Sequence, residues 1–308
     1  MIIFNYSLIC LIFGTTFLAI RIGVDASVPP FFSAGVRFLA AGAILFLFMI
    51  GRGKANWRLL WRKEFAIIGA CMTFGTFSAL YWAEQFVESG IAAVLSATGP
   101  LIILVLQALV LRQRPSRITA IGCLVGFTGI VLIMLPSLTV SSGTKWLIGC
   151  AAILVGELAY CVGTLYSKPV TQRYSKESPI AHNAVQMMYG GLLLLLLSAF
   201  TEHVRAESLF TWKGLGPLFY LIVIGSMVGH SLFYWLVSKT NPVFPSTWLY
   251  VSPIIALAIG ALFYGESLTW LSLAGVLTVI IGTILANASS LGPLLRKRTE
   301  ALYEARDF

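Results

Sequence analysis

A single carboxyl stands in the middle of a long apolar run, where water cannot solvate it. Glu157 follows Lys145 by twelve residues, which places it about 18 Å along a helix and close to the middle of a bilayer. No basic residue lies within two helical turns of it along the run. Burial without a partner favours the neutral acid, so Glu157 is suited to carry a proton or to bind a substrate amine. The alternative is a carboxyl held neutral by hydrogen bonds, for packing.

Two histidines also lie inside apolar runs. His230 precedes Tyr234 by four residues, and His182 precedes Gln186 by the same number, so each pair shares a helical face. Imidazole titrates in the working pH range, so either histidine could join a proton path, and His230 is the second candidate for proton coupling beside Glu157. The alternative for each is a hydrogen-bonded structural group.

Aromatic and hydroxyl side chains extend this set. Trp248 lies inside its run, too deep for the aromatic belt at a membrane surface. With the tyrosines and hydroxyls of neighbouring runs it could form the wall of an amphiphilic pocket, and core packing is the alternative. The candidate substrate-binding residues are Thr16, Tyr81, Ser96, Glu157, Tyr160, His230, Tyr234, Trp248 and Ser252.

Two prolines are candidate hinges. Pro100 and Pro253 each lie inside an apolar run, and each removes one intrahelical hydrogen bond. They are separated by 153 residues, a spacing that recurs in other residues of the chain. This matched placement favours a role as hinges, or as sites of freed carbonyls that face a cavity.

The runs that carry these residues have the composition of a membrane protein. The 308 residues are 58% hydrophobic and 11% charged, whereas a soluble domain has about 25% charged residues. The net charge of +9 comes from short loops and does not indicate nucleic-acid binding. The five cysteines all lie in apolar runs, so we expect neither a disulfide framework nor a metal site. We interpret the first run as a retained span, not as a signal peptide.

Ten runs are long enough to cross a membrane, and each must be helical because lipid offers its backbone no hydrogen-bond partner. The predicted fold class is therefore an all-α polytopic membrane protein. The runs are 2–20, 32–50, 65–84, 90–111, 118–135, 146–166, 180–199, 214–237, 244–264 and 268–287.

The chain contains an internal duplication. A shift of 153 positions superposes nine identical residues without a gap, among them Tyr81 on Tyr234, Pro100 on Pro253 and Gly122 on Gly275. The predicted repeats are 1–138 and 145–290, with five spans each, followed by a cytoplasmic tail, 291–308. Because five is odd, the second repeat enters the membrane inverted, which is the architecture of alternating-access carriers with a site near the midplane. The alternative is a duplication retained for stability.

Basic residues predict the orientation. With the N-terminus inside, sixteen of the 21 Lys and Arg residues lie on the cytoplasmic side and four outside, and Arg37 lies within a span. We therefore expect both termini in the cytoplasm of a cell that carries the protein in its inner membrane.

The sequence resembles the EamA family of the drug/metabolite transporter superfamily over about residues 7–287. The resemblance lies in FGTTFLAIRIG at 13–23, AGVRFLAAG at 34–42, SGIAAVL at 89–95, Pro253, and the Gly-Glu pair at 265–266. Phe13 stands where Trp is common, and Gln113 replaces the acidic partner of Glu266. The resemblance implies a ten-helix exporter of small metabolites, often amino acids or drug-like amphiphiles, that is coupled to protons or works as a facilitator.

The same resemblance bears on Arg37. It makes Arg37 a structural or gating residue rather than a ligand, and we assign Gln186, one turn before the repeat equivalent of Arg37, to the same group. Glu84 or Glu88 could pair with Arg37.

Other classes fit the sequence less well. A membrane-embedded enzyme needs clustered acids, histidine pairs or a nucleophile with its base, and the sequence has none of these constellations. A sugar-phosphate or nucleotide-sugar antiporter needs several interior basic residues, and Arg37 stands alone. We therefore expect a carrier, not an enzyme, with a neutral, zwitterionic or cationic small-molecule substrate and the lipid bilayer as partners. We expect no cofactor and no nucleic acid, and the sequence does not indicate an oligomeric state.

Overall fold

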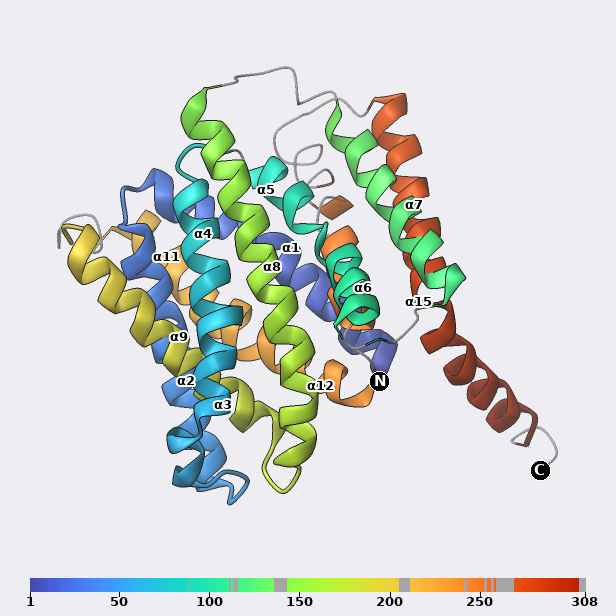
Figure 1. The fold of residues 1–308 in the computed structure, drawn as a ribbon, viewed down its shortest axis with the longest axis horizontal. Coiled ribbons are helices and arrows are strands. Elements are labelled where there is room, and N and C mark those ends of the chain that lie inside the picture. The colour runs from blue at the N-terminus through green and yellow to red at the C-terminus, as the bar shows by residue number, and fades with distance from the viewer. Residues whose placement is uncertain are drawn as a thin grey trace.

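The computed structural model describes residues 1–87, 89–110, 112, 116–135, 143–204, 211–240, 243–251, 254, 255, 258 and 269–304, and their regular structure is entirely helical (Figure 1). The predicted all-α class is therefore confirmed. Ser252, Pro253 and Glu88, named above, lie outside the described residues. The helices are α1 (Ile2–Asp25), α2 (Pro30–Gly51), η1 (Trp57–Trp61), α3 (Lys63–Ile68), η2 (Gly69–Gly75), α4 (Thr76–Ala83), α5 (Ser89–Ser96), α6 (Gly99–Leu109), α7 (Arg117–Met134), α8 (Thr144–Arg173), α9 (Pro179–Thr201), α11 (Trp212–Tyr220), η4 (Leu221–His230), α12 (Ser231–Lys239), α13 (Val243–Ser246) and α15 (Trp270–Glu304).

Among the described residues, six helical stretches are long and apolar enough to cross a membrane: Ile2–Asp25, Pro30–Gly51, Lys63–Ala83, Thr144–Arg173, Pro179–Thr201 and Trp212–Lys239. Shorter apolar helices cover Gly99–Leu109, Arg117–Leu132 and Leu273–Ala288. The predicted run 90–111 is two helices, α5 and α6, separated at Ala97 and Thr98, and Pro100 lies in the first turn of α6, where a missing N–H does no harm. The last helix continues to Glu304, well past the predicted start of a tail at 291.

The two halves run in opposite senses. In Figure 1 the start of α1 lies toward the bottom of the view, whereas α8, the first helix of the second half, starts at the top. The end of α15 also lies toward the bottom. We call the opposite end, which carries the turn at 26–29, the α1–α2 end.

Two π-helical segments interrupt long spans at matching places. η2 connects α3 to α4, and η4 connects α11 to α12. The shift of 153 residues carries Gly69 of η2 onto Ile222 of η4 and Gly75 onto Val228. A π-helix makes i→i+5 hydrogen bonds and appears often at functional sites. The apolar pattern of the sequence does not distinguish these segments from α-helix.

The second helices of the two halves form one tight antiparallel pair. A Cβ on Gly42 of α2 would lie 2.6 Å from the carbonyl oxygen of Ala184 in α9, so the two backbones touch. At the α1–α2 end the Glu202 carboxylate accepts the backbone N–H groups of Phe31 and Phe32, both at 2.8 Å. At the other end the Ser178 nitrogen donates to the Lys54 carbonyl at 2.9 Å. The two helices therefore contact each other in the middle and are joined by hydrogen bonds at both ends.

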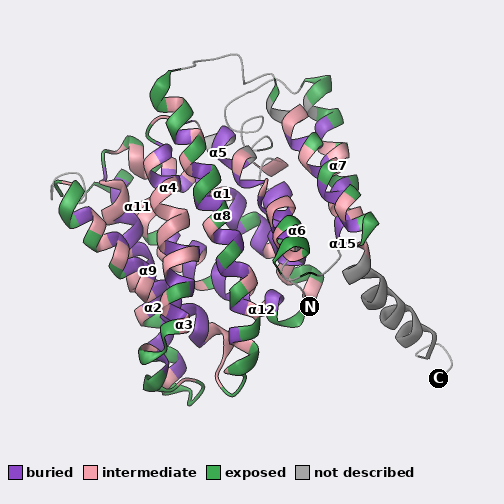
Figure 2. Cartoon of the chain, viewed as in Figure 1, coloured by how far each residue is buried: buried purple, intermediate pink, exposed green. Residues whose placement is uncertain are grey.

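Glycines join α7 to α15 in the same way. A Cβ on Gly122 would lie 2.1 Å from the backbone nitrogen of Ala286, and one on Gly282 would lie 2.2 Å from that of Gly126. Only small residues allow such an approach. The two helices lie side by side in Figure 1, and Figure 2 shows their outward faces exposed. The small-residue pair Gly122/Gly126 therefore serves contact within the chain.

Candidate functional site

A cavity of about 50 Å³ lies where helices of both halves meet. Its residues come from α1, α2, α4, α5, α8, η4, α12 and the segment after α13. A volume of this size holds a few water molecules, because one water needs roughly 10–15 Å³ measured in the same way. The lining side chains therefore leave room for water but not for a larger solute.

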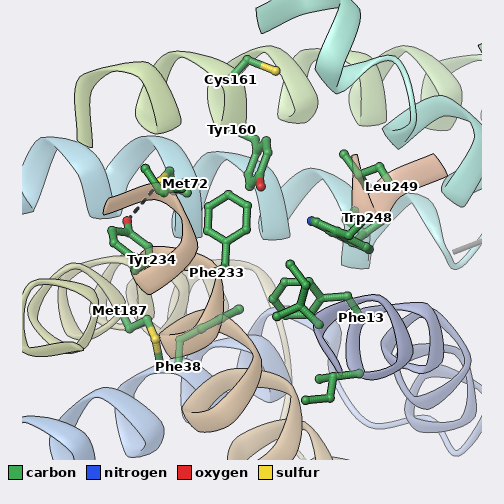
Figure 3. Packing of buried hydrophobic residues seen from close by; sticks show 14 of the residues in the cluster. Phe13, Phe38, Met72, Tyr160, Cys161, Met187, Phe233, Tyr234, Trp248 and Leu249 are labelled. Atoms are coloured by element: carbon green, nitrogen blue, oxygen red, sulfur yellow. Dashed lines mark hydrogen bonds between the residues drawn. The ribbon is translucent and has the colours of Figure 1, made fainter. Parts of the chain in front are cut away.

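Six aromatic residues line the cavity: Phe13, Phe17, Phe77, Tyr160, Phe233 and Trp248. The centroids of Phe13 and Trp248 are 4.6 Å apart, and those of Tyr160 and Phe233 are 5.9 Å apart. Figure 3 shows these four rings around a common space, with the Tyr160 hydroxyl directed toward Trp248. Tyr160 comes from α8, and Phe13 from α1, so the wall joins the two halves. Such a wall suits an apolar or aromatic body with a cationic group.

Glu157 brings a carboxyl into this apolar wall. Its side chain is 4% exposed, and its Oε1 atom has no hydrogen-bond partner among the described residues. Oε1 lies against the α carbon of Gly99 at the start of α6, because a Cβ built there would be 2.2 Å from it. The break between α5 and α6 therefore makes room for the carboxyl, and any larger residue at this position would displace it.

Arg37 and His230 lie on the other side of the cavity. The Arg37 Nε atom donates to the Ser226 hydroxyl at 2.8 Å, and its Nη1 atom donates to the Tyr81 hydroxyl at 3.1 Å. The guanidinium group also lies 5.2 Å from the centre of the Phe77 ring. The His230 ring packs among Phe13, Phe38 and Phe77, with centroids 5.1, 5.6 and 5.9 Å away.

The structure brings most of the predicted site together. Six of the nine candidate substrate-binding residues line the cavity: Thr16, Ser96, Glu157, Tyr160, His230 and Trp248. Tyr81 and Tyr234 are buried but are not among the lining residues. Tyr81 accepts the bond from Arg37, and the Tyr234 hydroxyl contacts the sulfur of Met72 at 3.1 Å.

The remaining candidates lie elsewhere. Gln186 accepts a hydrogen bond from Thr73 at 2.7 Å and donates to Asn183 at 3.0 Å, so it joins α9 to η2. His182 is stacked on Phe65 with centroids 5.0 Å apart, away from the cavity. The suggested pairing of Arg37 with Glu84 is absent from the described ion pairs and hydrogen bonds; the Nε and Nη1 atoms of Arg37 donate instead to Ser226 and Tyr81.

Sequence reasoning missed the phenylalanines of the wall. Phe13, Phe17 and Ile20 all line the cavity, and their spacing of four and three residues places them on one face of α1. That stripe was the available signal. An apolar side chain is as well suited to the lipid face of a membrane span as to a cavity face. The sequence therefore gave no signal that Phe77 and Phe233 line the cavity.

Comparison with known proteins identifies the chain. The model of the EamA-like transporter family matches residues 1–135 and again 147–288. The chain belongs to this family. It is 31% identical to YedA of Escherichia coli K12, described as an uncharacterized inner membrane transporter, over 88% of this chain and 86% of that protein.

This EamA protein is similar to other proteins over most of its length. It is 26% identical to the protein PagO of Salmonella typhimurium, over 91% of this chain and 90% of that one. A solved crystal structure superposes with a TM-score of 0.69 over 92% of this chain and 98% of that chain, at 16% identity, which shows the fold alone. The chain is thus a membrane transporter of the EamA type, with the cavity enclosed between its two matched segments.

Proposed function

We propose that this EamA protein exports small amine-bearing solutes, such as amino acids or amphiphilic amines, in exchange for protons by alternating access. The observation that carries the proposal is the Glu157 carboxyl, which is buried at an aromatic-lined cavity with an oxygen that lacks a hydrogen-bond partner among the described residues.

Burial of this carboxyl explains how exchange would work. A carboxylate without a partner is costly in an apolar site, so the cavity tolerates Glu157 when it holds a proton or when a substrate ammonium pairs with it. The two cations compete for one group. A carrier that closes only around an occupied carboxyl must return with a proton after it has released its substrate.

The walls and the arginine support the choice of substrate class. Aromatic faces attract cations and bury apolar bodies, which fits an amine with an apolar or aromatic part. Arg37 donates to Ser226 and Tyr81, so two of its donor atoms are already used. This arrangement favours amines over sugar phosphates, which need several free basic groups. We place both termini in the cytoplasm from the excess of basic residues on that side.

Uptake into proteoliposomes with an imposed pH gradient tests the proposal, with a panel of amino acids and amphiphilic amines. We expect concentrative uptake of at least one solute, with dissipation of the gradient, and we expect Glu157→Gln to abolish both. Glu64→Gln is the control, since Glu64 pairs with Arg173 at 3.5 Å and does not line the cavity. Downhill flux that is indifferent to pH would make the protein a facilitator and assign Glu157 to packing.

A further inference from the structure

A second carboxyl lies buried outside the cavity. Glu84 follows α4 at the α1–α2 end, and its relative exposure is 0%. Neither of its carboxylate oxygens has a hydrogen-bond partner among the described residues. It is not among the residues that line the cavity. Burial without a hydrogen-bond partner disfavours the charged carboxylate, so this arrangement favours the neutral acid.

The charged groups around Glu84 are engaged with other partners. Arg21 of α1 donates its Nη1 atom to the backbone carbonyl of Glu84 at 2.6 Å, and its Nε atom contacts Asp25 at 3.0 Å. Arg37 of α2 donates to Tyr81, one turn before Glu84.

Charged residues of the other helices at this end also interact with partners other than the Glu84 carboxylate. Lys145 of α8 lies over the ring of Phe86, with its Nζ atom 5.6 Å from the ring centre. Glu202, directly after α9, accepts the backbone N–H groups of Phe31 and Phe32 at the start of α2. No described cation forms an ion pair with the Glu84 carboxylate, although the guanidinium group of Arg21 donates to the backbone carbonyl of the same residue.

We propose that Glu84 is a second proton-binding group of this protein, and that its protonation holds the α1–α2 end closed. When this end opens, water reaches the carboxyl, the proton leaves, and the carboxylate pairs with Arg21, which has only to rotate from the carbonyl to the side chain of the same residue. Acid therefore favours the closed end and alkali favours the open end, because the closed form binds one more proton. This inference goes beyond the proposed function, since it concerns neither Glu157 nor any substrate.

Cysteine labelling of the purified protein in detergent tests it without transport. Ile20→Cys is the reporter, because Ile20 is 2% exposed, lines the cavity and precedes Arg21. Ser27→Cys, at an exposed residue of the turn at 26–29, is the reference. The five native cysteines are replaced first. The ratio of the two labelling rates with a charged maleimide cancels the effect of pH on the thiol itself.

We expect this ratio to rise with pH, by up to about tenfold per pH unit for the loss of one proton. Glu84→Gln, which mimics the neutral acid, should keep the ratio low at every pH, and Glu84→Asp should restore the rise. All of these proteins also carry Glu157→Gln, because Glu157 lines the same cavity as the reporter and would otherwise add its own titration. Glu64→Gln, at a carboxyl that pairs with Arg173 and does not line the cavity, should leave the rise intact. A ratio that is flat in the protein with Glu84, or that rises equally with Glu84→Gln, would overturn the proposal. If Glu84→Gln does not fold, an unchanged midpoint in Glu84→Asp would overturn it as well.

Discussion

Two helix crossings occupy equivalent places in the two halves of the molecule and are built from different chemistry. In the first, Thr73 of η2 donates to Gln186 of α9 at 2.7 Å. In the second, Ser226 of η4 accepts from Arg37 of α2 at 2.8 Å. Thr73 and Ser226 are related by the shift of 153 residues, so each half supplies the same hydroxyl from its π-helix. One hydroxyl meets a neutral amide and the other meets a cation.

The difference follows from one position. The same shift carries Arg37 onto Gly190. With glycine there, η2 and α9 approach until their backbones touch, because a Cβ on Gly190 would lie 2.7 Å from the carbonyl oxygen of Gly69. With arginine there, the guanidinium side chain fills the crossing and reaches the cavity. The duplication thus gives both crossings the same helix arrangement. A single residue then determines that the helices touch at one crossing and that a charged side chain lies between them at the other.

The largest effect on stability should come from adding a side chain where η2 crosses α9, at the contact between Gly69 and Gly190. A Cβ on Gly69 would lie 2.3 Å from the Gln186 carbonyl oxygen and 3.1 Å from the Gly190 nitrogen. Because these are backbone atoms, Gly69→Ala should destabilise the protein by about 2–3 kcal/mol. At the arginine crossing, a Cβ on Gly225 would meet only side-chain atoms, at 3.2 Å, so Gly225→Ala should have little effect. Melting curves in detergent measure both, and equal losses would contradict the comparison.

Removal of the charge should separate activity from stability. Arg37→Met and Gln186→Leu each leave buried polar partners without a hydrogen bond, so each should destabilise the protein by about 1–3 kcal/mol. They should differ in transport, because transport by Arg37→Met in proteoliposomes should fall at least about tenfold below that of the unaltered protein, or about 1.4 kcal/mol. Gln186→Leu, the matched change at the neutral crossing, should leave transport near its original rate. A similar loss of transport in both variants would assign Arg37 a purely structural role.

The smallest effects should come from the two hydroxyls. A hydrogen bond to a charged group contributes roughly 1.5–3 kcal/mol and a neutral one about 0.5–1.5 kcal/mol. Ser226→Ala should therefore destabilise the protein more than Thr73→Val does. A double-mutant cycle sharpens the test: with Arg37→Met in place, Ser226→Ala should add almost nothing, and full additivity would show that the two residues are not coupled.

Polar residues of the site were predictable because lipid penalises them. Glu157, Thr16, Ser96 and His230 stand in apolar runs, and a polar group in a span turns toward the interior of a bundle. All four line the cavity. The same argument named Tyr234, whose hydroxyl instead contacts Met72, because burial between helices satisfies a polar group as well as a cavity does.

The sequence predicted irregularities within the helices less well. The periodic apolar pattern of a span is the same in an α-helix and in a π-helix with one wider turn, so η2 and η4 were expected as uninterrupted helix. Pro100 was predicted as a hinge within the single run 90–111, and the structure instead separates α5 from α6 just before it, which leaves space for Glu157 over Gly99. Sequence indicated where each span would be irregular only when a proline marked the place.

By itself, the sequence determined the all-α class, the membrane setting and the duplication, because hydropathy and repeated residues are properties of the chain alone. It also determined which polar groups must avoid lipid. The tertiary structure decided which side chains contact one another. Phe13 of the first half packs on Trp248 of the second, and Glu84 is buried away from the cavity. Such meetings depend on how closely helices approach and how they are rotated about their axes. Distant small residues such as Gly69 and Gly190 set that approach, and no local pattern encodes it.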